Sequence, residues 1–119
     1  ERNDGESENN IIWGGMIMLR VDFTFDKKII EKNGYTMSNI YETIKMEFGK
    51  KNISCVAEGE VLSFGAGEKK NDFSDMWTII MRLTRSKWFL NYATSCTWNE
   101  NNKSEDVLAQ IKRKQMISA

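Results

Sequence analysis

The sequence predicts an α+β domain of the ferredoxin-like type, in which a β-α-β-β-α-β sheet carries helices on one face and a C-terminal helix follows. Three observations predict it. Residues 16–25 end in an alternation of apolar and polar side chains, as in a half-buried strand. Residues 37–48 carry an apolar stripe at helical spacing. Residues 72–100 pass from helical periodicity to a β-branched and aromatic run.

The composition indicates one domain with its own hydrophobic core. Of the 119 residues, 40% are hydrophobic and 11% are aromatic, which suffices for folding without a disulfide or a metal. The first ten residues contain no apolar side chain, so we expect a flexible tail at 1–15 and one domain at 16–119. The sequence shows neither a transmembrane run nor a signal peptide, so we expect a cytoplasmic protein and no membrane partner.

The first strand is predicted at residues 16–25, because apolar and polar side chains alternate along its second half. One face of this strand is therefore buried and the other meets solvent. Such a strand suits a sheet that helices cover on one side only. The apolar face comprises Leu19, Val21, Phe23 and Phe25, and the polar face comprises Arg20, Asp22 and Thr24.

The first helix is predicted to begin after Thr36, which suits an N-cap, and to end at Gly49, which suits a left-handed C-cap. Between these residues, one continuous stripe of apolar side chains follows the helical period. Glu42, Lys45 and Glu47 lie off the stripe and are expected in solvent. The stripe consists of Met37, Ile40, Tyr41, Ile44 and Phe48.

A hairpin is predicted at residues 53–66, where two short apolar runs flank a polar turn. Gly59 lies in that turn and favours a tight reversal of the chain. Residues 65–72 are glycine-rich and charged, and we expect a surface loop there.

Residues 72–100 decide the topology, and two interpretations are open. A hairpin there would give a β-α-β-β-β-α order. A helix at 73–84 fits better, because the three consecutive apolar residues at 79–81 break strict alternation. Ser86 is expected to cap a further helical turn, and residues 94–98 are expected to form the fourth strand.

The last helix is predicted to begin at Ser104 as its N-cap, with Glu105 and Asp106 in the first turn. A polar turn at 99–103 separates it from the fourth strand. The short apolar stripe of this helix consists of Val107, Leu108 and Ile111.

The two cysteines, Cys55 and Cys96, are expected to be free, buried thiols in a reducing compartment. In the predicted topology the first and third strands are central, and the second and fourth strands are edges. The two thiols would then lie on opposite edges, beyond the roughly 7 Å between Cα atoms that a disulfide spans.

The composition also limits the chemistry of the chain. It contains no histidine, so the commonest general base and the commonest transition-metal ligand are missing. No cofactor, metal or catalytic site is predicted. The alternative to a binding protein is a small enzyme or ligand-binding domain that uses carboxylates, for which the pairs Asp22 with Asp26 and Glu58 with Glu60 are candidates.

Protein association is the function that the sequence favours. Net charge is zero, with 17 basic and 17 acidic residues, which argues against a duplex nucleic-acid partner. Single-strand binding on sheet aromatics is a weaker alternative. A domain of this size rarely buries four tryptophans completely, so exposed aromatics are expected to form an interface with a second copy or another protein. The predicted interface residues are Trp13, Trp88, Phe89 and Trp98.

Three stretches resemble a loose group of small uncharacterised bacterial proteins carried by mobile elements. They are GYTMSNIYETIK at 34–45, CVAEGEVLSF at 55–64 and WTIIMRLTRSKWF at 77–89. The resemblance implies a cytoplasmic bacterial accessory protein, with which an immunity or regulatory role is compatible. It implies no catalytic residue.

Overall fold

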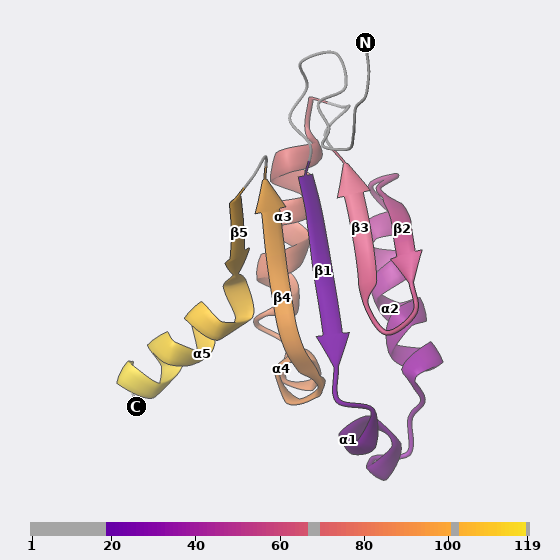
Figure 1. The fold of residues 1–119 in the computed structure, drawn as a ribbon, viewed down its shortest axis with the longest axis vertical. Helices are drawn as coiled ribbons and strands as arrows, with labels where there is room; N and C mark the ends of the chain where they lie inside the picture. Colours follow the sequence, from indigo (N-terminus) through magenta and orange to yellow (C-terminus); the bar gives the residue numbers. More distant parts are fainter. Residues whose placement is uncertain (1–18, 67–69, 101–102, 119) are drawn as a thin grey trace.

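The computed structural model describes residues 19–66, 70–100 and 103–118, which form one five-stranded antiparallel sheet and five helices (Figure 1). The predicted tail, residues 16–18 of the predicted first strand, and Trp13 lie outside these ranges. None of the helices described is long and apolar enough to cross a membrane. In chain order the elements are β1 (Leu19–Phe25), α1 (Lys27–Lys32), α2 (Met37–Gly49), β2 (Ser54–Glu58), β3 (Leu62–Ala66), α3 (Asp72–Leu83), α4 (Lys87–Tyr92), β4 (Ala93–Glu100), β5 (Lys103–Asp106) and α5 (Val107–Ser118).

The strands lie in the order β2-β3-β1-β4-β5, so β1 is central and pairs with both β3 and β4. Val21 lies opposite Phe64 on one side and opposite Trp98 on the other. This register places the apolar faces of β1, β3 and β4 on one side of the sheet. Helices α2, α3 and α4 cover that side, and the polar side of β1 stays open (Figure 1).

The core lies between the sheet and these helices. Phe23 is fully buried, and its ring meets that of Phe89 edge to face, with centroids 5.8 Å apart. Burying one such side chain contributes about 1.5–3 kcal/mol to folding, and each aromatic pair adds about 1 kcal/mol. The core therefore joins the central strand directly to α4.

Helix α2 begins as predicted but ends differently. Thr36 forms a capping box, because its hydroxyl accepts from the Asn39 amide while the Asn39 side chain accepts from the Thr36 amide. The prediction of a left-handed C-cap at Gly49 is wrong. The chain continues for one more turn, and the left-handed residue is Asn52 with φ 59°. There Ile53 N–H donates to the carbonyl of Phe48 at 3.1 Å, which closes the helix end.

Helix α1 was not predicted. It has six residues and only one buried side chain, Ile30, so its sequence carries no periodic stripe. Its start is nevertheless encoded locally, because the Asp26 carboxylate accepts from the Ile29 amide at 3.2 Å. Asp26 is thus an N-cap.

The helical interpretation of residues 73–84 is confirmed, since they lie within α3 apart from the C-cap Thr84. Ser86 is the N-cap of α4, as expected, and β4 contains the predicted strand at 94–98. The predicted hairpin is also confirmed, as β2 and β3 pair in antiparallel fashion.

The predicted start of the last helix at Ser104 is wrong. Residues 103–106 form the fifth strand, in which Ser104 pairs with Asn99. The helix starts at Val107, and the Asp106 carboxylate accepts from the Ala109 amide at 3.2 Å. The four consecutive polar residues 103–106 fit an exposed strand as well as a capped turn, and pairing with β4 decides between them.

The added strand changes the position of one cysteine. Because β5 covers β4, the expectation that β4 is an edge is wrong, and Cys96 is buried inside the sheet. Cys55 lies on the edge strand β2 and is exposed, so the expectation that both thiols are buried is also wrong. Both cysteines are free.

Candidate functional site

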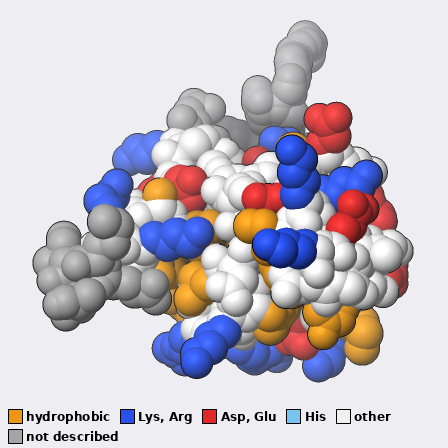
Figure 2. Space-filling model, turned by 90° about the horizontal axis from the view of Figure 1, so that it is seen from below, with side chains coloured by type: hydrophobic (Ala, Val, Ile, Leu, Met, Phe, Trp, Pro, Cys, Tyr) orange, Lys and Arg blue, Asp and Glu red, His pale blue; other side chains and the backbone are white. Residues whose placement is uncertain are grey.

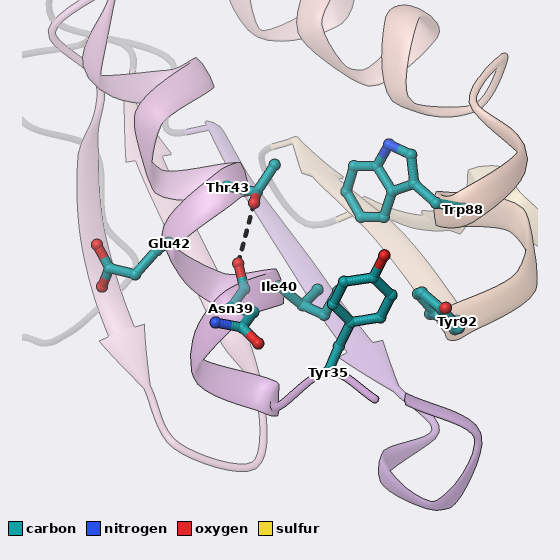
Figure 3. Close-up of a pocket in the computed structure, with 7 residues that line it drawn as sticks. All are labelled: Tyr35, Asn39, Ile40, Glu42, Thr43, Trp88 and Tyr92. Atoms are coloured by element: carbon teal, nitrogen blue, oxygen red, sulfur yellow. Dashed lines mark hydrogen bonds between the residues drawn. The ribbon is translucent and has the colours of Figure 1, made fainter. Parts of the chain in front are cut away.

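An open cavity of about 640 Å³ lies between the first half of α2 and helix α4 (Figure 3). We call it the aromatic groove. Three aromatic rings form one side of it, and polar side chains of α2 form the other. Its lining residues are Tyr35, Asn39, Ile40, Glu42, Thr43, Trp88 and Tyr92.

Tyr35 owes its position to two local signals that adjoin it. Gly34 has φ 87°, a left-handed conformation that a side chain would oppose, and it ends α1. The Tyr35 amide donates back to the Ile30 carbonyl at 3.1 Å, which completes that helix end. On its other side, Thr36 caps α2. A short segment fixed at both ends therefore holds a ring that is 53% exposed.

The other two rings come from α4. Tyr92 lies edge-on to Tyr35, with ring centroids 6.4 Å apart, and is itself buried. Trp88 is partly buried and contacts Phe89 at right angles, with centroids 5.9 Å apart. Phe89 is fully buried and anchors this turn to the core. The groove thus has an aromatic wall formed by the rings of Tyr35, Trp88 and Tyr92 (Figure 3).

Polar groups of α2 face the same space. The Thr43 hydroxyl donates to the Asn39 carbonyl at 2.9 Å, and the Asn39 side-chain oxygen accepts from the Thr36 amide at 2.9 Å. Across the described ranges, the side-chain amide nitrogen of Asn39, the hydroxyl of Tyr35 and the indole nitrogen of Trp88 have no hydrogen-bonding partner. These groups can orient a polar ligand or a peptide backbone.

Charges near the groove are of both signs. Lys45 contacts Glu42 at 3.3 Å and Glu58 at 3.0 Å, and these hydrogen bonds raise the pKa of the lysine. Glu42 is therefore already paired. Helix α1 contacts both α2 and α4 and exposes Lys28 and Lys32. Lys87 adds a third exposed lysine beside Trp88. Figure 2 views this end of the molecule and shows hydrophobic side chains among side chains of both charges.

Tyr41 follows the groove residue Ile40 in α2, but its side chain holds the β2–β3 turn in place instead of lining the groove. Its hydroxyl donates to the Gly59 carbonyl at 2.6 Å and so ties the β2–β3 turn to α2. Burial raises the pKa of Tyr41, and the carboxylates of Glu58 and Glu60 raise it further. The hydroxyl therefore stays protonated and remains a donor.

Of the predicted interface residues that the structure describes, Trp88 and Phe89 contact each other, whereas Trp98 packs with Phe73 and Trp77. Trp88 lines the aromatic groove, Phe89 lies in the core and Trp98 is buried in β4. Sequence reasoning missed Tyr35 and Tyr92. A signal for Tyr35 was present, because it stands between a turn glycine and a helix cap.

The candidate carboxylates have separate partners. Asp22 lies on the open face of the sheet, where it accepts from Arg20 at 2.9 Å, Ser63 at 2.6 Å and Asn99 at 2.9 Å. Glu58 pairs with Lys45. Within residues 19–66, 70–100 and 103–118, no group of three or more His, Cys, Asp or Glu residues is placed to hold a metal ion.

The two thiols differ in reactivity. Burial raises the pKa of Cys96 well above its usual range, and the carboxylates of Asp106 and Asp22 add to the effect. Cys96 is therefore a neutral thiol at physiological pH, whereas Cys55 is open to solvent.

Comparisons of the chain with protein-family models, with curated proteins and with solved structures found no match. Function is therefore inferred from the geometry of the aromatic groove.

Proposed function

We propose that this protein is a non-catalytic interaction module that binds a short peptide segment of a partner protein in the aromatic groove. The observation that carries the proposal is Tyr35, a large ring left 53% exposed on a rigid segment beside Trp88. Tyrosine and tryptophan are the residues that most often dominate the energy of protein interfaces.

The proposed occupant has an apolar anchor residue. The cavity of about 640 Å³ is bounded by Ile40, Tyr92 and the ring of Trp88, and it accepts a large side chain from a partner. The unpaired polar groups of Tyr35 and Asn39 stand at its edge, where they can bond the backbone of an extended segment.

The occupant is also acidic beside its anchor. Helix α1, which precedes Tyr35 and contacts α2 and α4, exposes Lys28 and Lys32, and α4 exposes Lys87. Complementary charges of this kind raise association rates and select among partners, and added salt weakens them.

The groove is prepared for binding before the partner arrives. The Gly34 turn and the Thr36 capping box fix the backbone on both sides of Tyr35. Ordering loops and side chains on association normally costs free energy, so a prearranged ring retains more of its contact energy as affinity.

The test is selection of a displayed random peptide library on the full chain. We expect enrichment of peptides with one apolar or aromatic residue next to Asp or Glu. Tyr35→Ala and Trp88→Ala should each weaken the selected peptides about tenfold or more. Met46→Ala is the matched control, because Met46 is exposed on α2 but lies outside the groove.

Two results would contradict the proposal. Either no peptide is enriched, or the enriched peptides bind both groove variants as well as the parent chain. The mass of the protein in solution tests a third outcome. If the chain is a dimer and Trp88→Ala dissociates it, the occupant of the groove is a second copy of the chain.

A small molecule is the second candidate ligand, because about 640 Å³ falls in the range of roughly 300–1,000 Å³ typical of such sites. Screening a fragment library by NMR distinguishes the two. If fragments shift the resonances of Tyr35 and Trp88 and no peptide does, the ligand of the groove is a small molecule.

The fold is proposed to be a ferredoxin-like sheet extended by β5. The position of β1 between β3 and β4, with β2 outside β3, supports this assignment. Helices between β1 and β2 and between β3 and β4 support it as well. An experimental structure in which β4 did not pair with β1 would contradict it.

A further inference from the structure

We propose a second site, separate from the aromatic groove, that binds a quaternary alkylammonium group such as the trimethylammonium head of choline. A cavity of about 410 Å³ lies between α3 and the β4–β5 pair. We call it the Trp98 pocket, and it goes beyond the peptide-binding function. Its lining residues are Phe73, Trp77, Trp98, Glu100, Lys103 and Glu105.

Three aromatic rings of the pocket meet nearly at right angles. Phe73 and Trp77 each stand against Trp98 with ring centroids 5.4 Å apart, at interplanar angles of 80° and 86°. Phe73 and Trp77 line the pocket with partly exposed rings, whereas Trp98, 6% exposed, is the ring on which both pack. A compact cation is attracted to the face of an exposed aromatic ring within about 6 Å of its centroid.

Two of these rings stay partly exposed although both pack on Trp98, which belongs to the core. The buried face of α3 consists of Met76, Ile79, Ile80 and Leu83 together with Asp72. Phe73 and Trp77 lie one turn apart on its flank, with exposed fractions of 48% and 40%. A pair of large rings kept in solvent beside a third, buried ring is typical of a binding surface.

The charge of the lining favours a cation. Glu100 and Glu105 contribute two carboxylates, and Lys103 contributes one ammonium, so the lining carries a net charge of −1. The ammonium group of Lys103 therefore competes with a bound cation for the attraction of these two carboxylates.

Both carboxylates are already hydrogen-bonded by the protein. Glu100 accepts from the indole nitrogen of Trp98 at 3.2 Å, and Glu105 accepts from the side chain of Gln110. Each carboxylate keeps further acceptor positions, so these bonds alone do not exclude a primary ammonium. The partly exposed rings of Phe73 and Trp77 favour the quaternary group, which needs no acceptor and is attracted to ring faces and to the field of the carboxylates.

The experiment is a titration of the full chain with choline and with 3,3-dimethylbutan-1-ol, which replaces the ammonium nitrogen by carbon at the same shape. Binding is followed by the indole N–H resonances in NMR. We expect choline to shift the resonances of Trp77 and Trp98 but not that of Trp88, and to bind at least about fivefold more tightly than the neutral alcohol.

Variants of exposed lining residues sharpen the test. Trp77→Leu and Glu105→Gln should weaken choline binding several-fold, and Lys103→Gln should strengthen it. Met46→Ala is the control and should leave choline binding unchanged, because Met46 is exposed on α2 and lines neither cavity. Circular dichroism of each variant shows that its fold is retained.

Three outcomes would overturn the proposal. Equal affinity for choline and the neutral alcohol would mean an apolar pocket without cation recognition. Tighter binding of butylammonium than of butyltrimethylammonium would mean a site for a primary ammonium. No shift of the Trp77 and Trp98 resonances at saturating choline would mean that the pocket binds neither. Loss of this site would leave the peptide-binding result unaffected, because the groove shares no lining residue with it.

Discussion

Phe48 of α2 stacks on Phe64 of β3, with ring centroids 4.0 Å apart and ring planes 7° from parallel. Both side chains are almost completely buried. This contact fixes the end of α2 over the hairpin, and the same residue accepts the hydrogen bond from Ile53 that closes the helix. One residue thus sets both the packing and the length of α2.

Removing this ring should be among the most destabilising single changes. We expect Phe48→Ala to lower the free energy of unfolding by about 3–5 kcal/mol, since it removes buried surface and leaves a cavity. Urea denaturation followed by tryptophan fluorescence measures it. Met46→Ala, in the same helix at a position 64% exposed, should change the free energy by less than about 0.5 kcal/mol. Similar losses in both variants would contradict the packing described.

Two glycines should respond in opposite ways to the same substitution. Gly34 has φ 87° and open space around it, so Gly34→Ala should cost about 1–2 kcal/mol through backbone strain alone. Gly49 is helical and also has open space, so Gly49→Ala should stabilise by about 0.5–1 kcal/mol. Thermal unfolding of the Gly34→Ala and Gly49→Ala variants measures both changes in stability. A stabilised Gly34→Ala chain would show that the turn before Tyr35 is not left-handed.

Periodicity explains how much of this fold the sequence could predict. Helix α3 was found because its apolar residues repeat at helical spacing, and β1 because its residues alternate. Helix α1 and strand β5 lack any such signal, since α1 buries one residue and no residue of β5 is fully buried. Their conformations depend on a cap and on pairing with β4, which only the folded chain supplies.

The candidate site was less predictable than the fold. Trp88 is predicted from its residue type and its position after the polar residues 84–87, whereas its partner Tyr35 lies about fifty positions away in a segment between two helices. The burial of Phe89 and Trp98 could not be read from the sequence either. Each stands at an element boundary or register position that the tertiary pairing sets, and Trp98 is covered by Phe73 and Trp77 of another element.

The two thiols should differ sharply in their rate of reaction with an aromatic disulfide reagent. We expect one fast-reacting group, Cys55, in the folded chain and a second, Cys96, only after unfolding in denaturant. Cys55→Ser should abolish the fast phase and leave the slow one. Two fast phases in the folded chain would contradict the burial of Cys96.

The raised pKa of Cys96 also predicts a pH dependence of stability. In the unfolded chain this thiol loses its proton near pH 8.5, but burial keeps it protonated in the folded chain. The folded state then binds more protons, so stability should fall as pH rises from about 8.5 to 10, by at most about 1.4 kcal/mol per pH unit. Urea denaturation at several pH values measures the slope. Cys96→Ala should remove this slope. An unchanged slope in that variant would mean that another titrating group causes the pH dependence.

Tyr35 should matter for binding and hardly at all for stability. Its ring is 53% exposed, and among the described residues its aromatic contact is the edge-on pair with Tyr92. We therefore expect Tyr35→Ala to lower the free energy of unfolding by less than about 1 kcal/mol, while it weakens the selected peptides about tenfold. Tyr35→Phe separates the ring from the hydroxyl, because it keeps the packing and removes the unpaired polar group. Equilibrium unfolding and peptide binding, measured on the same preparations, give both quantities. A loss of stability comparable with that of Phe48→Ala would show that Tyr35 is part of the core, and the exposed ring would then carry no argument for a partner.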